Sequence, residues 1–215
     1  MKSRLTAICG PMFSGKSLEL IHRVDLIETQ GLDVVCYTPN SRYTQDGGGR
    51  TMIRSRHGAK LPAFYLDSGL SGYKLFSALT ESIRLGFNPP DVIAIDEAQF
   101  FIETELCFAV DEMMRHYGVN FIIAGLSRDY AGLPFGAMPS IITMADEVVQ
   151  LHAVCSRCKS LDGTRTIRVT DSKEKVVLDS DIYDVYCSTC LWESQKTKSE
   201  IESVEQLKKL PVKLV

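Results

Sequence analysis

The sequence lacks the long apolar runs and the excess of one charge that mark several common classes of protein. It contains no stretch of about 18 consecutive apolar residues, so it predicts no membrane-spanning helix. Lys and Arg total 24 against 27 Asp and Glu, and the formal net charge is −3. This balance does not favour binding to nucleic acid. The start, Met1–Arg4, leads into only a short apolar stretch, so we expect no signal peptide.

The sequence also lacks an even set of cysteines. Seven cysteines argue against a framework closed by disulfide bonds, and a reducing, cytoplasmic location is expected. Cys9, Cys36 and Cys107 stand in apolar contexts that are typical of small core residues. No internal repeat is evident. What remains, 45% apolar and 24% charged residues in a chain of 215, is typical of one globular domain with at most a small appendage.

Short apolar runs alternate with amphipathic stretches along the chain. The pattern predicts strands over residues 5–9, 34–37, 63–66, 91–95, 119–124 and 147–151, and helices over 16–30, 73–85 and 103–116. Such alternation predicts an α/β fold with a parallel sheet and sites at the strand ends. Residues 39–58, polar and rich in Arg and Gly, predict a flexible basic loop. We expect the chain to have three parts: an α/β domain over 1–151, a smaller cysteine-containing region over 152–192, and a charged, helical tail over 193–215.

The first strand runs directly into a glycine-rich loop that opens a helix. This loop has the full G-x-x-x-x-G-K-S pattern of a P-loop: Gly10, Pro11, Met12, Phe13, Ser14, Gly15, Lys16 and Ser17. In such a loop the backbone N–H groups and the helix N-terminus surround phosphate groups. Lys16 is expected to reach the β- and γ-phosphates of ATP, and the Ser17 hydroxyl to bind Mg²⁺.

A second acidic site follows the strand predicted over 91–95. Asp96 would face the P-loop and bind Mg²⁺, directly or through water, as in a Walker B strand. Glu97 is a candidate general base for an attacking hydroxyl or water. Taken alone, the pair could be an exposed acidic turn. The P-loop upstream favours the catalytic interpretation.

Two C-x-x-C pairs stand near the end of the chain. Cys155 with Cys158 and Cys187 with Cys190 are separated by 28 residues, which a hairpin can span, and together they predict a closed, structural Zn²⁺ site. His152 as a ligand and a redox role for one pair are the alternatives. Between residues 152 and 192 six Lys/Arg stand against six Asp/Glu, so this region shows no basic face for nucleic acid.

In combination these motifs resemble the thymidine kinases of the zinc-containing, tetrameric type found in bacteria and animal cytosol. The resemblance runs from about Leu5 to Cys190. It rests on the P-loop with the following Glu19-Leu20-Ile21, on Asp96–Phe101, on Gly125–Gly136 with its Asp129-Tyr130, on Thr164–Arg168, and on Tyr183. It implies a P-loop NTPase (RecA-like) parallel sheet flanked by helices, with a small zinc-binding lasso domain.

The resemblance also implies residue roles. Glu97 would take the proton of the nucleoside 5′-hydroxyl, Arg56 would steady the transferred phosphate, and Gln99 would lie with Asp96 on the ATP side. The residues around the nucleoside would be Phe100, Leu126, Tyr130, Thr166 and Tyr183. A homotetramer with feedback by deoxythymidine triphosphate is implied as well. From the residues alone, core packing for the aromatic and leucine side chains and a solvated charge for Arg56 stay open.

The chain departs from the family pattern at three places. Ser127 stands where an acidic residue is usual, Asp179-Ser180 replaces a Gly-Gly pair, and the segment 38–43 is shorter. These changes concern the acceptor and leave the phosphate chemistry intact. The alternatives are therefore a kinase of another deoxynucleoside, a P-loop ATPase whose zinc module binds nucleic acid, or a non-catalytic nucleotide-binding relative.

Overall fold

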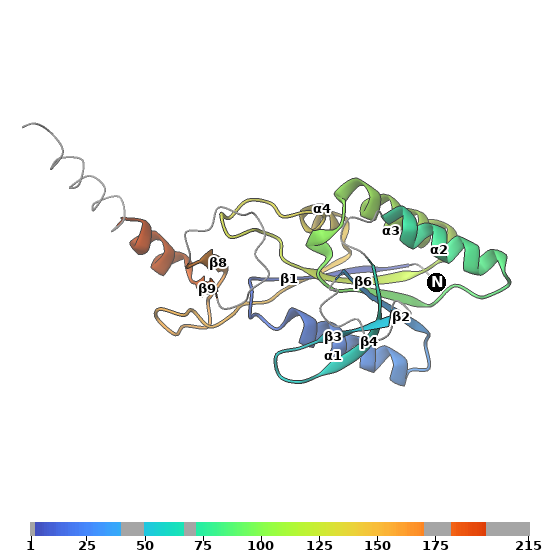
Figure 1. The fold of residues 1–215 in the computed structure, drawn as a ribbon, viewed down its shortest axis with the longest axis horizontal. Coiled ribbons are helices and arrows are strands. Elements are labelled where there is room, and N and C mark those ends of the chain that lie inside the picture. Colours follow the sequence, from blue (N-terminus) through green and yellow to red (C-terminus); the bar gives the residue numbers. More distant parts are fainter. Residues whose placement is uncertain (1–2, 40–49, 67–71, 170–181, 197–215) are drawn as a thin grey trace, which may run out of the picture.

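A computed structural model describes residues 3–39, 50–66, 72–169 and 182–196 of the chain. Its centre is a sheet of seven strands with the order β3-β4-β2-β5-β6-β1-β7 (Figure 1). Neighbouring strands are parallel except β3, which is antiparallel to β4. The strands are β1 (Leu5–Cys9), β2 (Val34–Thr38), β3 (Arg50–Arg54), β4 (Lys60–Tyr65), β5 (Val92–Ile95), β6 (Asn120–Gly125) and β7 (Glu147–Gln150). The expected α/β fold is confirmed.

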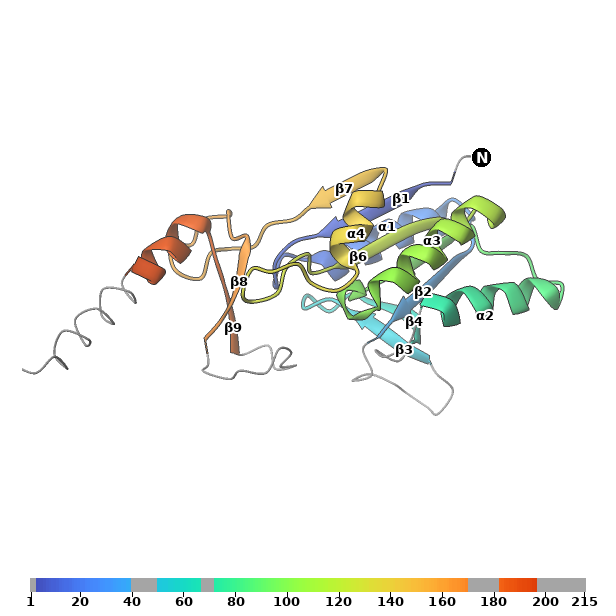
Figure 2. The same cartoon turned by 90° about the horizontal axis from the view of Figure 1, so that it is seen from above.

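Helices cover both faces of this sheet (Figures 1 and 2). Alternate residues of a strand point to opposite faces, so one strand serves two cores. In β5, Ile93 and Ile95 pack in the core beneath the helices of one face, whereas Val92 and Ala94 pack toward α1. The helices are α1 (Lys16–Thr29) on one face, and α2 (Gly72–Arg84), α3 (Glu103–Tyr117) and α4 (Met138–Met144) on the other.

The prediction of a basic loop over residues 39–58 is wrong for its second half. Arg50–Arg54 forms β3, which pairs with β4 in an antiparallel hairpin. Thr51 and Ile53 are buried at alternate positions, and the pairing supplies the backbone hydrogen bonds that a loop would lack. The arginines at both ends of this five-residue strand masked its pattern. The glycine triplet at 47–49 lies outside the described residues.

A smaller unit lies beyond the carboxyl end of the central sheet (Figure 2). It contains a two-stranded antiparallel sheet of β8 (Arg165–Arg168) and β9 (Tyr183–Tyr186), followed by a helix over 188–196. Its core cluster consists of Cys155, Cys187 and Cys190, with Tyr186 packed against them. None of the described helices has the length and apolarity to cross a membrane.

Candidate active site

The carboxyl ends of four parallel strands meet at one edge of the central sheet. Gly10 follows β1, Asp96 follows β5, Leu126 follows β6 and Leu151 follows β7. Ligands of open α/β sheets bind in this position, outside the carboxyl ends of the strands. The sheet therefore brings together the P-loop, which ends at Ser17, and the acidic pair, which begins at Asp96.

The P-loop is shaped by glycines at both of its ends. A Cβ at Gly10 would lie 2.5 Å from the carbonyl oxygen of Leu151, so only glycine fits where β1 leaves the sheet beside β7. Gly15 has φ of 86° and precedes α1, and its carbonyl accepts the N–H of Glu19 at 3.0 Å. The first N–H groups of α1 have no partners within the helix and can bind an anion.

Lys16 is a buried cation in this loop, with 9% of its surface exposed. Its Nζ donates a hydrogen bond of 2.8 Å to the carbonyl of Pro11, so the side chain folds back over the loop. Burial lowers the pKa of Lys16, and the nearby Glu97, Asp96 and Cys9 partly oppose this shift. An amine held this way is placed to neutralise an anion that enters the loop.

Asp96 is the buried acid that faces this lysine. Burial, and then the charge of Glu97, raise its pKa to about 7, against the stabilising hydrogen bonds from the Ser17 hydroxyl and the Glu97 backbone N–H. The contact between Ser17 and Asp96 joins the P-loop to the end of β5. A hydroxyl and a carboxylate are both oxygen donors of the kind that Mg²⁺ prefers, so this pair fits that ion.

Glu97 occupies a backbone conformation that side-chain-bearing residues seldom adopt. Its φ of 55° and ψ of 39° lie in the left-handed region, directly before the 3₁₀ helix η2 (Ala98–Phe100). Such strain is kept where surrounding structure imposes it, often at functional sites. The Glu97 carboxylate accepts a hydrogen bond of 2.5 Å from Nε2 of Gln99.

Gln99 itself is almost completely buried, with 2% of its surface exposed. Besides its bond to Glu97, its Oε1 accepts the backbone N–H of Leu126 at 2.9 Å. Both ends of the amide are thus bonded to protein. Phe100, next in sequence, packs edge-on against Phe135 with ring centroids 5.7 Å apart.

The smaller unit contacts the sheet edge at two places. The hydroxyl of Thr166 in β8 accepts the backbone N–H of Met12, within the P-loop, at 2.9 Å. The guanidinium of Arg168 lies 3.8 Å from the ring centroid of Tyr130 and donates a hydrogen bond of 2.9 Å to the Tyr183 hydroxyl. Thr166, Tyr130 and Tyr183, which are expected around the nucleoside, therefore all take part in contacts between the two units or in the group that makes them. Arg168, which the sequence analysis did not single out, joins two of them.

Arg56 is exposed, and its guanidinium lies 3.8 Å from the ring centroid of Phe13. Phe13 belongs to the P-loop and has φ of 64°, so the loop turns its ring toward the hairpin of β3 and β4. A cation over an aromatic ring is attracted by the electron-rich ring face. This contact brings Arg56 to the phosphate loop.

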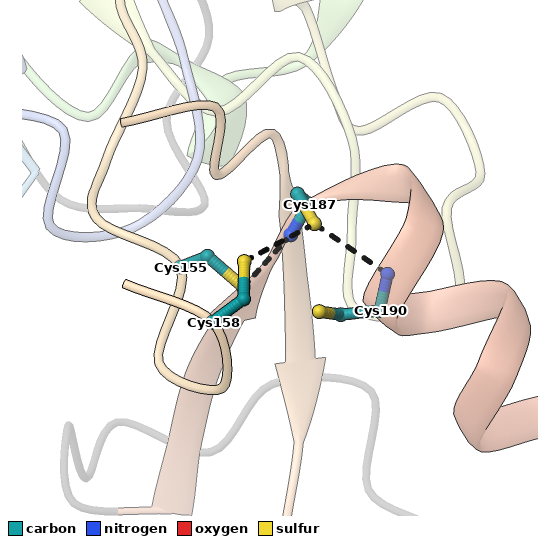
Figure 3. A group of neighbouring side chains, drawn as sticks. All are labelled: Cys155, Cys158, Cys187 and Cys190. Atoms are coloured by element: carbon teal, nitrogen blue, oxygen red, sulfur yellow. Dashed lines mark hydrogen bonds between the residues drawn. The ribbon is translucent and has the colours of Figure 1, made fainter. Parts of the chain in front are cut away.

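The four paired cysteines form one compact cluster (Figure 3). Their sulfur atoms all lie within 4.8 Å of one another, and Cys158 Sγ is 3.8 Å from Cys187 Sγ. Four sulfur ligands of a tetrahedral zinc ion, at about 2.3 Å from the metal, have a similar spacing. Backbone N–H groups donate to two of the sulfurs, Cys187 N to Cys155 Sγ and Cys190 N to Cys187 Sγ. The cluster is consistent with zinc, and the exposed His152 is not one of its members.

A P-loop after β1, a buried Asp96 with the half-buried Glu97 after β5, and a largely parallel α/β sheet define a P-loop nucleotide-binding enzyme. The chain also matches the family model described as "Thymidine kinase" over residues 3–191. It belongs to the thymidine kinase family, and its reaction is the phosphorylation of thymidine with ATP. The predicted family, enzyme class and acceptor are thereby confirmed.

Relatives and solved structures give the scale of this similarity. The chain is 33% identical to the thymidine kinase of Mycoplasma mobile over 204 residues, which cover 94% of this chain and 93% of that protein. It is 33% identical to the thymidine kinase of Mesomycoplasma hyopneumoniae (strain 7448) over 188 residues, or 86% and 94%. The genome packaging NTPase B204 of Sulfolobus turreted icosahedral virus 2 is a distant structural match, with a TM-score of 0.44, 18% identity, and coverage of 81% and 79%.

Proposed function

We propose that the transfer takes place at the carboxyl edge of the sheet, from the γ-phosphate of ATP to the 5′-hydroxyl of thymidine. The observation that carries this proposal is the convergence of Lys16, Asp96 and Glu97 around Ser17, at the ends of β1 and β5. The residues that would surround the phosphates are Gly10, Pro11, Met12, Phe13, Ser14, Gly15, Lys16 and Ser17. Ser17 and Asp96 would hold Mg²⁺, which when bound neutralises charge on the phosphates.

Glu97 is the general base of this proposal. Its carboxylate would accept the proton of the 5′-hydroxyl as that oxygen bonds to phosphorus. The hydrogen bond from Gln99 and the left-handed backbone together fix the direction of this carboxylate. Positioned acid–base groups contribute about 10²–10⁴-fold to a rate.

Lys16 and Arg56 supply positive charge to the group in transfer. Phosphoryl transfer passes through a loose transition state, so most of the acceleration comes from positioning and electrostatics. Lys16 acts from a fixed, buried place. Arg56 acts from the β3–β4 hairpin, where the ring of Phe13 holds it close to the loop.

The nucleoside would lie between the sheet edge and the smaller unit, surrounded by Phe100, Leu126, Tyr130, Thr166 and Tyr183. The contact of Arg168 with Tyr130 and Tyr183 supports this arrangement, because it joins the two units beside the carboxyl edge of the sheet. A kinase must keep water away from the transferred phosphate. The smaller unit, with β8 and β9, would serve as the cover that does so. Zinc held by the four cysteines would give the cover its shape.

The departures from the family pattern concern the proposed acceptor site. At Ser127 the backbone carbonyl accepts the N–H of Phe135 at 3.2 Å, a contact that an acidic residue at this position would make equally well. Asp179 and Ser180 lie outside the described residues. We also propose the division into 1–151, 152–192 and 193–215, a homotetramer, feedback by deoxythymidine triphosphate and a cytoplasmic location, as the family resemblance implies.

An acceptor panel tests the reaction. ADP release from Mg-ATP is measured with thymidine, deoxyuridine, deoxycytidine, deoxyguanosine, single-stranded DNA or no addition. We expect thymidine to give the largest stimulation and thymidine monophosphate as product. Stimulation by DNA and by none of the nucleosides would contradict the proposal. A preference for another nucleoside would show that the departures from the family pattern change the choice of acceptor.

The role of Glu97 is tested by Glu97→Gln, which keeps the size of the side chain and removes its ability to accept the proton. The turnover number should fall by about 10²–10⁴-fold while ATP affinity stays unchanged. Glu81→Gln, on the exposed surface of α2, is the matched control and should behave as the wild type. Full transfer by Glu97→Gln would remove Glu97 from its role.

A further inference from the structure

The amide of Gln99 joins the acidic pair to the wall of the acceptor site. Its Nε2 donates to Glu97 at 2.5 Å, and its Oε1 accepts the backbone N–H of Leu126 at 2.9 Å. Glu97 follows β5 and Leu126 follows β6, so one side chain connects the ends of two neighbouring strands. Since an amide offers both a donor and an acceptor, glutamine can make both bonds at once.

Two glycines pack closely against Gln99, Gly125 against its side chain and Gly136 against its backbone. A Cβ at Gly125 would lie 2.6 Å from Gln99 Oε1, and one at Gly136 would lie 1.7 Å from the Gln99 carbonyl oxygen. Gly136 also has φ of 52°, which favours glycine. Both glycines belong to the segment from the end of β6 to α4. This segment closes over Gln99 and leaves it 2% exposed.

Burial and bonding argue against a direct contact of Gln99 with ATP. Only 2% of the Gln99 surface is exposed, so a nucleotide could reach the amide only if the segment that covers it moved away. The side chain instead bonds to the carboxylate proposed as the base. We propose that Gln99 is a positioning residue, which aims the Glu97 carboxylate and fixes it relative to Leu126 in the acceptor wall.

This inference rests on the proposed role of Glu97 and explains how the fold imposes that role. The left-handed backbone at Glu97 sets where the side chain leaves the chain, and Gln99 sets where its carboxylate ends. A displacement of about 1 Å between reacting groups can cost about 10²-fold in rate. Gln99 also bonds to the backbone of Leu126, which is proposed to contact the nucleoside. It would therefore fix the position of the base relative to the nucleoside.

Two substitutions separate the functions of the amide. Gln99→Glu keeps an acceptor for the Leu126 N–H but turns a carboxylate toward Glu97, whereas Gln99→Met removes both bonds at similar length. We expect both to lower the turnover number by about 100-fold and to change the dissociation constant of ATP by less than about twofold. A selective rise in that constant of about tenfold, with turnover unchanged, would assign Gln99 to ATP and overturn the inference.

Asn120 offers a matched control at the opposite end of β6. Its amide also bridges two segments, since Oδ1 accepts the N–H of Arg4 and Nδ2 donates to the carbonyl of Asp91. Asn120→Leu should lower the melting temperature and leave turnover unchanged. If Asn120→Leu lowers turnover as much as Gln99→Met at a similar loss of stability, the effect is structural and the inference fails.

A double-mutant cycle tests whether Gln99 acts through Glu97. In the Glu97→Gln background, adding Gln99→Met should change the residual single-turnover rate by less than about twofold, because the aimed carboxylate is already gone. Losses that multiply would overturn the inference while leaving Glu97 as the base. A near wild-type rate for Glu97→Gln alone would overturn the proposed role of Glu97, and the inference with it.

Discussion

The central sheet packs apolar side chains against helices on both faces, whereas the unit with β8 and β9 has three cysteines at the centre of its core cluster. Within this apolar packing, Lys16 and Asp96 are buried and are held by hydrogen bonds to the P-loop and to Glu97. An isolated two-stranded sheet is marginally stable in water, so the smaller unit depends on its sulfur cluster and on its contacts with the sheet. The two halves of the site should thus be separable by experiment.

Removal of the metal should have the largest effect, and it should damage the smaller unit while leaving the central sheet intact. In Cys187→Ser, or after treatment with a strong chelator, we expect the zinc content to fall and thymidine phosphorylation to drop by about 1000-fold or more, because the cover loses its core. ATP affinity should change by less than about threefold, since the P-loop belongs to the other core. Elemental analysis, ATP binding and product formation measure the three effects. Normal activity in a zinc-free protein would contradict the prediction.

Lys16→Met should damage the other half of the site. Loss of a buried cation beside the phosphates is expected to lower kcat/KM by about 10²–10³-fold. The zinc content should not change, because the four cysteines belong to the smaller unit. Steady-state kinetics and elemental analysis measure both, with Lys74→Met on the exposed face of α2 as control. A loss of zinc in Lys16→Met would show that the two halves are not separable.

Arg168→Lys should weaken the junction between the halves. Lysine cannot stack its head group flat on Tyr130 while bonding Tyr183, so we expect the KM for thymidine to rise by about tenfold and ATP affinity to remain. Arg157→Lys, which lies on the same unit near Cys190 and Glu193, is the control. Equal effects of the two substitutions would show that any arginine of this unit matters equally.

Tyr130→Phe is expected to have the smallest effect. The contact with Arg168 uses the face of the ring, which phenylalanine retains, so the KM for thymidine should change by less than about twofold. Tyr130→Ala removes the ring and should approach the effect of Arg168→Lys. A large effect of Tyr130→Phe would mean that the hydroxyl, rather than the ring, contacts the nucleoside.

Much of the fold could be predicted from local patterns. The strands β1, β5 and β6 are continuous apolar runs that end in glycine or acid, and the long helices α1 and α3 have clear amphipathic periods. The P-loop and the paired cysteines were visible because their spacing alone specifies the chemistry. The clustering of the four sulfurs confirms the interpretation of the two C-x-x-C pairs as one site.

The remainder depends on tertiary contacts. β3 begins and ends with arginine and is stabilised by its pairing with β4, and α4 begins within a segment without a clear helical pattern. The burial of Gln99 could not be read from its own residue type, because glutamine is usually exposed. Its signal lies elsewhere in the chain, at Gly125 and Gly136, whose missing side chains make room for it.

The hydrogen bond from Met12 to Thr166 has a consequence for how the two substrates affect each other. Met12 lies in the loop that surrounds phosphate, and Thr166 lies in the cover, so the bond spans both binding steps. If binding of one substrate shifts this bond and so changes the affinity for the other, the second substrate changes the affinity for the first by the same factor, because thermodynamic linkage is reciprocal. Met12 and Thr166 thus form a direct contact between the phosphate-binding loop and the smaller unit.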